Sequence, residues 1–222
     1  MAKKILVYGD SNTWGWIGVE EAFPSTRYTD AERWAGVMAA ELGEGFDVAV
    51  DGLTVRATNL NDTMDWNAIK ADMFNGAKTL PAAIAREMPV DLLIIMLGTN
   101  DLKADTNRSA TDIAAAIVEV AKVAEGCAGG VAYHYSAPKV LVVSPPPVND
   151  MPHPDFAAMF EGAKAKSEAL GAALKSVADQ AGIASFDAGA LVGNARGVDG
   201  LHMSKDQHAL LGKAIAETVR TL

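Results

Sequence analysis

The stretch Leu92-Leu93-Ile94-Ile95-Met96-Leu97-Gly98-Thr99-Asn100-Asp101 passes directly from an apolar run to a glycine and three polar residues. A short apolar run without alternation is typical of a central strand in a parallel sheet, where helices bury both faces. Further β-rich runs occur along the chain with helical segments between them, so the predicted strands cover residues 4–8, 46–50, 91–97, 140–144 and 183–186. This alternation predicts βαβ units and an α/β fold with a five-stranded parallel sheet.

Helical periodicity is clearest in segments that cover residues 31–42, 81–87, 109–124, 155–181 and 205–221. Ser204 stands where an N-cap would open the last helix, and Gly43 and Gly182 stand just past two others. The 222 residues contain no linker, internal repeat or low-complexity stretch. We therefore expect one domain over residues 1–222.

The composition argues against several classes of function. A formal net charge of -9 disfavours a nucleic-acid partner, because such proteins usually carry a basic face. No run approaches the roughly 20 apolar residues that cross a bilayer, so we expect no membrane partner. Cys127 is the only cysteine and the N-terminus has no signal-peptide pattern, so we expect a cytoplasmic protein. Phosphate and dinucleotide motifs and metal-ligand spacings are missing, so we expect no cofactor and no metal.

Ser11 lies in Gly9-Asp10-Ser11-Asn12-Thr13, between the first predicted strand and a segment that can turn into a helix. Ligands of open parallel sheets bind outside the carboxyl ends of the strands, so we expect the Ser11 hydroxyl to face a crevice there. Its backbone N–H would lie at a helix N-terminus, where it can donate to an anion. The alternative is that Asp10 and Ser11 only cap a helix.

The segment Asp199-Gly200-Leu201-His202 precedes the last predicted helix. A serine hydroxyl needs a base to take its proton, and an imidazole base needs a carboxylate that holds its tautomer. The short spacing lets Asp199 turn back onto His202, which predicts a triad with Ser11. The alternative is that Asp199-Gly200 is simply a turn and that His202 starts a helix.

Asn100 follows the central strand, and its side-chain amide can donate to an oxygen that becomes negative in a tetrahedral intermediate. Trp14 and Trp16 flank the serine loop, where they could wall a pocket or pack in the core. The substrate-binding residues that we expect are Asp10, Asn12, Trp14, Trp16 and His153, with a surface loop as the alternative for His153. The region 61–79 carries several large apolar residues outside any predicted strand and is a lid, a pocket rim or a subunit contact.

Taken together, these blocks resemble those of the SGNH (GDSL) hydrolase family: Gly-Asp-Ser near the N-terminus, a glycine block, Gly-x-Asn-Asp and a late Asp-x-x-His. The chain carries them in this order at 9–11, 52–56, 98–101 and 199–202, so the resemblance covers nearly its whole length. Longer stretches, among them 9–16 and 137–147, are similar to the bacterial arylesterase and acyltransferase branch.

The resemblance implies a three-layer α/β/α, flavodoxin-like SGNH hydrolase fold and a serine esterase with Ser11, Asp199 and His202 as its triad. It also implies an oxyanion hole made by the N–H groups of Ser11 and Val55 and by the amide of Asn100. For the branch, it implies hydrolysis of small aryl and acetyl esters, acyl transfer to alcohols or peroxide, and a homo-oligomer, namely an octamer.

Two departures from the branch concern the pocket. Val55 stands where the family has glycine and this branch has alanine, so the backbone donor remains but the β-branched side chain would narrow the acyl site. The stretch 65–75 is longer than is usual in the branch. Two alternatives stay open: a carbohydrate O-acetylesterase or thioesterase on the same scaffold, and a non-catalytic binding protein with the same sheet.

Overall fold

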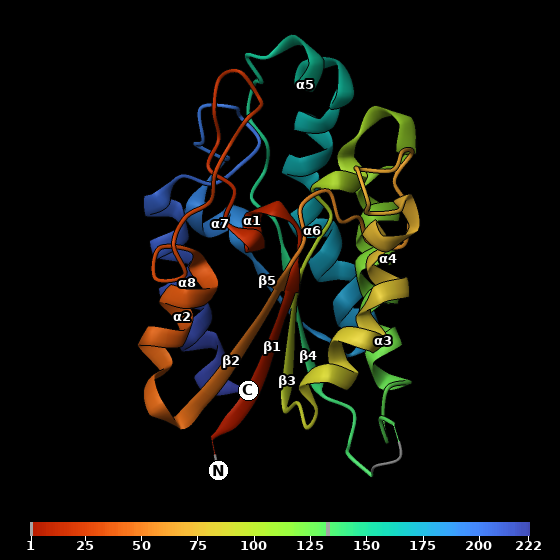
Figure 1. The fold of residues 1–222 in the computed structure, drawn as a ribbon, viewed down its shortest axis with the longest axis vertical. Coiled ribbons are helices and arrows are strands. Elements are labelled where there is room, and N and C mark those ends of the chain that lie inside the picture. Colours follow the sequence, from red (N-terminus) through yellow and green to blue (C-terminus); the bar gives the residue numbers. More distant parts are fainter. Residues whose placement is uncertain (1, 132–133) are drawn as a thin grey trace.

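A computed structural model describes residues 2–131 and 134–222 of the chain. Its centre is a parallel sheet with the strand order β2-β1-β3-β4-β5 (Figure 1). The strands are β1 (Lys3–Gly9), β2 (Phe46–Gly52), β3 (Leu92–Met96), β4 (Lys139–Ser144) and β5 (Ala184–Asp187). The predicted five-stranded parallel sheet is therefore confirmed.

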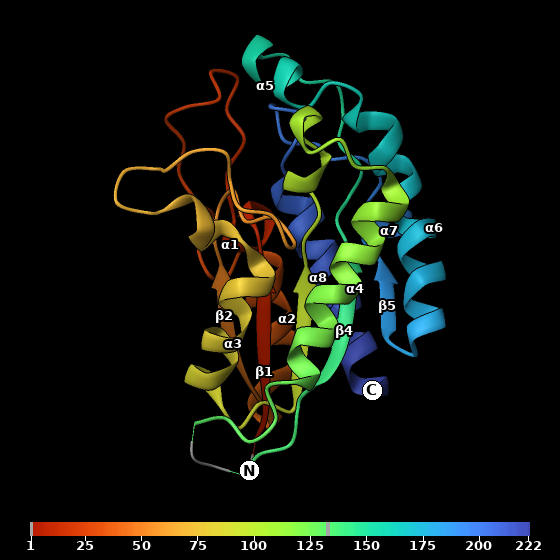
Figure 2. The ribbon, with the colours of Figure 1, turned by 90° about the vertical axis from the view of Figure 1, so that its right-hand side faces the viewer.

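Helices cover both faces of this sheet, as Figures 1 and 2 show from two directions. One layer holds α2 (Trp34–Leu42), α7 (Ala188–Val192) and α8 (Lys205–Thr221), and the other holds α3 (Gly76–Glu87), α4 (Ala110–Glu125) and α6 (Ala163–Ala181). The short helices α1 (Ser11–Trp14) and α5 (Pro154–Met159) lie at the end of the sheet where the strands finish. The predicted three-layer architecture is confirmed.

Strand β3 separates two apolar cores. Leu93 and Ile95 pack against the layer of α3, α4 and α6, whereas Ile94 and Met96 pack against the layer of α2 and α8. All four side chains are fully buried, and each burial stabilises the fold by roughly 1.5–3 kcal/mol. The uniformly apolar sequence of β3 follows from this two-sided burial.

Three helix predictions need correction. The helix predicted over 155–181 is two helices, α5 and α6, because Gly162 has φ +74°, a left-handed conformation that a helix interior does not allow. Helix α3 begins at Gly76, five residues before the predicted start, since the Asn75 side chain accepts from the Lys78 N–H and caps it. Helix α7 is missing from the prediction, because five residues are too few to show a helical period.

Within the part of the chain that the structure describes, every helix is too short or too polar to span a bilayer.

Candidate active site

Ser11 is the first residue of α1, directly beyond the carboxyl end of β1. The turn between the two elements requires glycine at position 9, because a Cβ there would lie 2.2 Å from Thr13 Oγ1 and 2.7 Å from the Met96 carbonyl oxygen. The Asp10 carboxylate accepts from the Asn12 N–H at 2.9 Å and caps the helix. The tight turn thus holds the Ser11 hydroxyl at the edge of the sheet.

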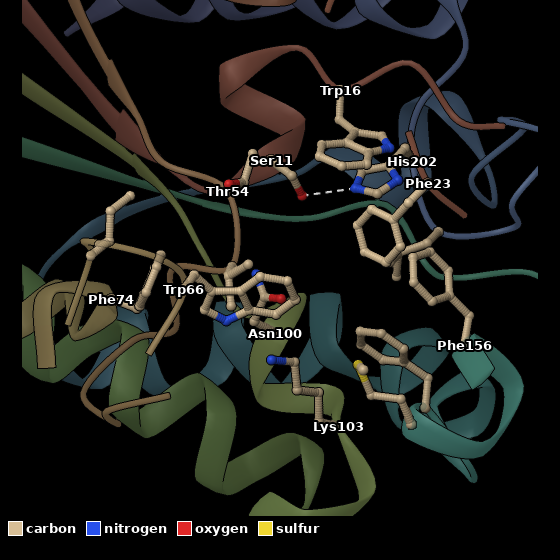
Figure 3. Close-up of a pocket in the computed structure, with 15 residues that line it drawn as sticks. Ser11, Trp16, Phe23, Thr54, Trp66, Phe74, Asn100, Lys103, Phe156 and His202 are labelled. Carbon is tan, nitrogen blue, oxygen red and sulfur yellow. Dashed lines mark hydrogen bonds between the residues drawn. The ribbon is translucent and has the colours of Figure 1, made fainter. Parts of the chain in front are cut away.

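His202 connects Ser11 to Asp199 through two short contacts. Its Nε2 lies 2.8 Å from Ser11 Oγ, and its Nδ1 lies 2.6 Å from Asp199 Oδ2 (Figure 3 shows the first contact). The other carboxylate oxygen, Oδ1, accepts from the N–H groups of Leu201 and His202, both at 3.0 Å. With Nδ1–H donated to the carboxylate, Nε2 is left to accept the serine proton. This geometry is that of a nucleophile, a base and an orienting carboxylate.

The two buried carboxyl groups near Ser11 have shifted pKa values of opposite sign. Burial alone would raise the pKa of Asp199, but the hydrogen bond and charge of His202 and two backbone N–H groups hold it below its usual value. Burial raises the pKa of Asp10 to about 6, and the Asn12 N–H offsets only part of this effect. Asp199 is therefore kept as the anion that stabilises an imidazolium.

Asn100 lies at the start of a short 3₁₀ helix (Asn100–Leu102) after β3. Its Nδ2 donates to the Arg56 carbonyl oxygen at 3.1 Å, which fixes the amide and leaves its second N–H for a ligand. Val55, in the loop after β2, has φ +69°, which is rare for a β-branched residue. Ser11, Val55 and Asn100 all line one cavity, so the structure brings the three residues expected to supply oxyanion donors to the same place.

The cavity has a volume of about 320 Å³ and opens beside Ser11. Most of its wall is aromatic or aliphatic, and its lining residues are Ser11, Trp16, Phe23, Thr54, Val55, Trp66, Ile69, Phe74, Asn100, Lys103, Phe156, Met159, Phe160, Leu201 and His202 (Figure 3). The Trp16 ring stacks on His202, with 5.5 Å between centroids and 23° between planes. Such walls suit a small ester with an apolar or aromatic part.

Several lining residues were not predicted as site residues. Phe23 follows α1, whereas Phe156 and Phe160 lie one turn apart at α5, so no sequence motif joins the three. Trp66 and Phe74 belong to the region 61–79, which the structure makes a wall of the cavity. The one available signal was a cluster of large apolar residues outside any strand.

Of the five residues expected to bind substrate, only Trp16 lines the cavity. Asp10 and Asn12 are buried and serve the loop itself, which corrects the expectation. Asp10 caps α1, and Asn12 Oδ1 accepts from the Met203 N–H at 2.9 Å, which ties the serine loop to the segment after His202.

Trp14 and His153 also lie outside the lining, although each contacts a residue within it. Trp14 packs against Trp16, with 6.0 Å between ring centroids, and the Arg27 guanidinium carbon lies over the Trp14 ring, 4.9 Å from its centroid. His153 caps α5, because its Nδ1 accepts from the Asp155 N–H, and its ring packs on Phe156. The structure thus places both residues next to lining residues rather than in the lining itself.

No group of three or more His, Cys, Asp or Glu side chains that could hold a metal ion occurs among residues 2–131 and 134–222.

The comparisons with known proteins agree with this geometry. Residues 7–210 match the model of the GDSL-like lipase/acylhydrolase family. The inhibitor-bound aryl esterase of M. smegmatis is 44% identical to the chain, with a TM-score of 0.94 and 100% of both chains covered. Est24, a carbohydrate acetylesterase from Sinorhizobium meliloti, is 43% identical, with a TM-score of 0.93 and 99% of both chains covered. The comparison with curated proteins found no match.

Proposed function

The chain belongs to the GDSL-like lipase/acylhydrolase family and is a carboxylic ester hydrolase, and we propose that it hydrolyses small aryl and acetyl esters through an acyl-serine intermediate on Ser11. One observation carries this proposal: the Ser11 hydroxyl, 2.8 Å from His202 Nε2, stands in the mouth of an aromatic cavity. A serine that only capped α1 would have no reason to contact a histidine and carboxylate pair.

In the proposed mechanism, His202 Nε2 takes the Ser11 proton as Oγ attacks the ester carbonyl, and Asp199 stabilises the imidazolium. The oxyanion accepts from the free N–H of the Asn100 amide and from the backbone N–H groups of Ser11 and Val55. His202 then gives its proton to the leaving oxygen as the tetrahedral intermediate collapses. Water, activated by the same imidazole, releases the acid and restores Ser11.

The aromatic wall supports an aryl leaving group. Trp16 stacks on His202, which must reach the leaving oxygen, so an aryl group beside that oxygen would lie against Trp16 and its neighbour Phe23. The similarity to an aryl esterase supports the same choice. A carbohydrate O-acetylesterase is the second candidate, because a protein with that description is almost as similar.

Acyl transfer to an alcohol or peroxide would follow if such a molecule reached the acyl-enzyme before water did. The apolar cavity supports this possibility, because it favours an alcohol over water. Assembly as a homo-oligomer is also part of the proposal and rests on the resemblance to the branch. Product partitioning in water–alcohol mixtures tests the first point, and the mass in solution tests the second.

The central test replaces Ser11 by alanine and compares it with Ser176→Ala, which changes an exposed serine on α6. We expect Ser11→Ala to lose several orders of magnitude in kcat for phenyl acetate with an unchanged circular dichroism spectrum, and Ser176→Ala to keep full activity. An organophosphate should label the wild type once, at Ser11. Near-normal turnover by Ser11→Ala would disprove the role of this serine.

Phenyl acetate and a peracetylated sugar separate the two substrate classes. A higher kcat/KM for the aryl ester supports the proposal, and a higher kcat/KM for the sugar supports the second candidate.

A further inference from the structure

The cavity beside Ser11 contains one permanently charged side chain among its lining residues, that of Lys103. The rest of the lining is aromatic, aliphatic or neutral polar, apart from His202, and contains no carboxylate. Figure 3 shows Lys103 across the cavity from the Ser11–His202 pair, with its amine directed toward the interior. A substrate that reaches both ends would therefore meet a nucleophile at one end and a cation at the other.

The Lys103 ammonium has an incomplete set of partners. Within the part of the chain that the structure describes, its one ion pair is with Asp62 Oδ2, at 3.4 Å. Charge-assisted N–H···O bonds are usually about 2.7–2.9 Å long, so this contact is weak. An ammonium has three N–H groups, and at least two remain for a ligand.

Holding the Lys103 ammonium at this position without a ligand costs free energy of hydration. The Lys103 side chain is only 16% exposed and faces apolar walls, where a cation loses hydration that one carboxylate oxygen at 3.4 Å only partly replaces. The Asp62 side chain is 3% exposed, and while its Oδ2 contacts Lys103, its Oδ1 accepts from the Met64 N–H at 3.2 Å, so the charge of the carboxylate is divided between two partners. A second carboxylate inside the cavity would complete the coordination of the ammonium.

We propose that Lys103 is a specificity-determining residue that selects esters carrying a carboxylate remote from the scissile bond. The substrate class is either a half-ester of a dicarboxylic acid or an ester of a carboxylated phenol. The proposal rests on the esterase function of the Ser11 site. Since hydrogen bonds between charged groups contribute more than neutral ones, the carboxylate should raise kcat/KM about 10- to 100-fold over a neutral isostere.

The test compares two pairs of esters, each with an anionic member and a neutral isostere. Monophenyl succinate and phenyl pentanoate place the carboxylate on the acyl group, whereas 4-acetoxybenzoate and 4-acetoxybenzamide place it on the leaving group. The measured quantity is the ratio of kcat/KM for the anionic ester to that for its neutral partner, because general damage to the enzyme cancels in this ratio.

We expect Lys103→Met to lower this ratio about 10- to 100-fold for one pair, and Lys103→Arg to retain most of it. The pair that responds shows on which side of the scissile bond the carboxylate binds. Asp62→Asn should raise the same ratio several-fold, since it removes the competing carboxylate.

Ratios within twofold of the wild type for Lys103→Met, in both pairs, would overturn the proposal. Hydrolysis of phenyl acetate reports separately on the esterase function. If the wild type does not hydrolyse it in a Ser11-dependent way, the proposed function fails; if it does and the ratios do not move, only the role of Lys103 fails.

Discussion

Replacing Val55 by glycine should stabilise the fold and lengthen the acyl group that the site accepts. Val55 has φ +69°, and a left-handed backbone costs an L-residue roughly 1–2 kcal/mol, with β-branched residues at the upper end. Glycine avoids this cost but adds about 0.5–1 kcal/mol of unfolded-state entropy. The net gain is about 1 kcal/mol, which for a chain of 222 residues raises Tm by about 2–4 °C.

The same substitution should enlarge the cavity beside the proposed oxyanion site, because Val55 is one of the residues that line the cavity. One methylene in a substrate pocket changes specificity about 10- to 200-fold. If the isopropyl group blocks acyl chains longer than acetyl, Val55→Gly should raise the kcat/KM ratio of 4-nitrophenyl butyrate to acetate by about tenfold or more. The backbone donor is retained, so kcat for the acetate should stay within a few-fold.

Val55→Ala is the matched control, since alanine keeps the Cβ and most of the backbone strain but lacks the branch. It should widen the acyl range without the full gain in Tm. Thermal unfolding and steady-state kinetics on acetate, propionate, butyrate and hexanoate esters measure both effects. A Val55→Gly protein that unfolds at a lower temperature and keeps the wild-type acyl profile would refute both parts of the reasoning.

Two further predictions concern Asn100 and Asp10. Asn100→Ala should lower kcat for phenyl acetate about 10²- to 10³-fold with little change in KM, because the amide acts on the transition state; a changed KM with normal kcat contradicts this. Asp10 has a pKa of about 6 when folded, against 3.8 for the ordinary carboxyl group. As the pH rises, this carboxyl group therefore loses its proton at a lower pH in the unfolded chain than in the folded protein. Stability should therefore fall by about 3 kcal/mol as the pH rises from 3.8 to 6. When the free energy of unfolding is measured with urea between pH 4 and 7, the Asp10→Asn protein should not show this loss. Parallel pH profiles for the variant and the wild type would contradict the role of Asp10.

The sheet was predictable because each strand coincides with a short apolar run in the sequence. The apolar run predicted over 91–97 contains β3 (Leu92–Met96), and the other four runs overlap β1, β2, β4 and β5. The break between α5 and α6 was not predictable from periodicity, since the apolar spacing continues through Gly162 while its backbone turns left-handed. The local apolar pattern thus predicted where helices and strands occur more accurately than where each one begins and ends.

The positions of the proposed reacting groups were predictable for a related reason. Ser11 and Asn100 belong to short motifs that directly follow β1 and β3, which fixes where their side chains go. His202 belongs to a short motif just before α8, and its spacing from Asp199 brings these two side chains together. The cavity wall has no such motif, because Trp66, from the region 61–79, and Phe156, on α5, come to line the same cavity only in the folded chain. Asp10 and Asn12 were misjudged because nearness to the nucleophile in sequence does not distinguish facing the substrate from bracing the loop.

A buried network of charged and polar side chains connects the loops that follow β2 and β3. Asp101 is fully buried and accepts from the Thr58 N–H at 3.0 Å, from Thr58 Oγ1 at 2.5 Å and from Arg108 at 2.5 Å. The loop after β3 is thereby bonded to the loop after β2. Moving the loops apart would break both Thr58 hydrogen bonds to a buried carboxylate, and hydrogen bonds to charged groups contribute about 1.5–3 kcal/mol each.

Arg56 extends the network to the first strand. Its guanidinium donates to the Gly9 carbonyl oxygen at 2.9 Å and to the Asp51 carbonyl oxygen at 2.8 Å, while its own carbonyl oxygen accepts from Asn100. One residue therefore links the loops that present Ser11, Val55 and Asn100. Because the proposed oxyanion donors are held by the protein before an ester binds, they would need no reorganisation when negative charge develops, which is the condition under which such a site lowers the barrier most.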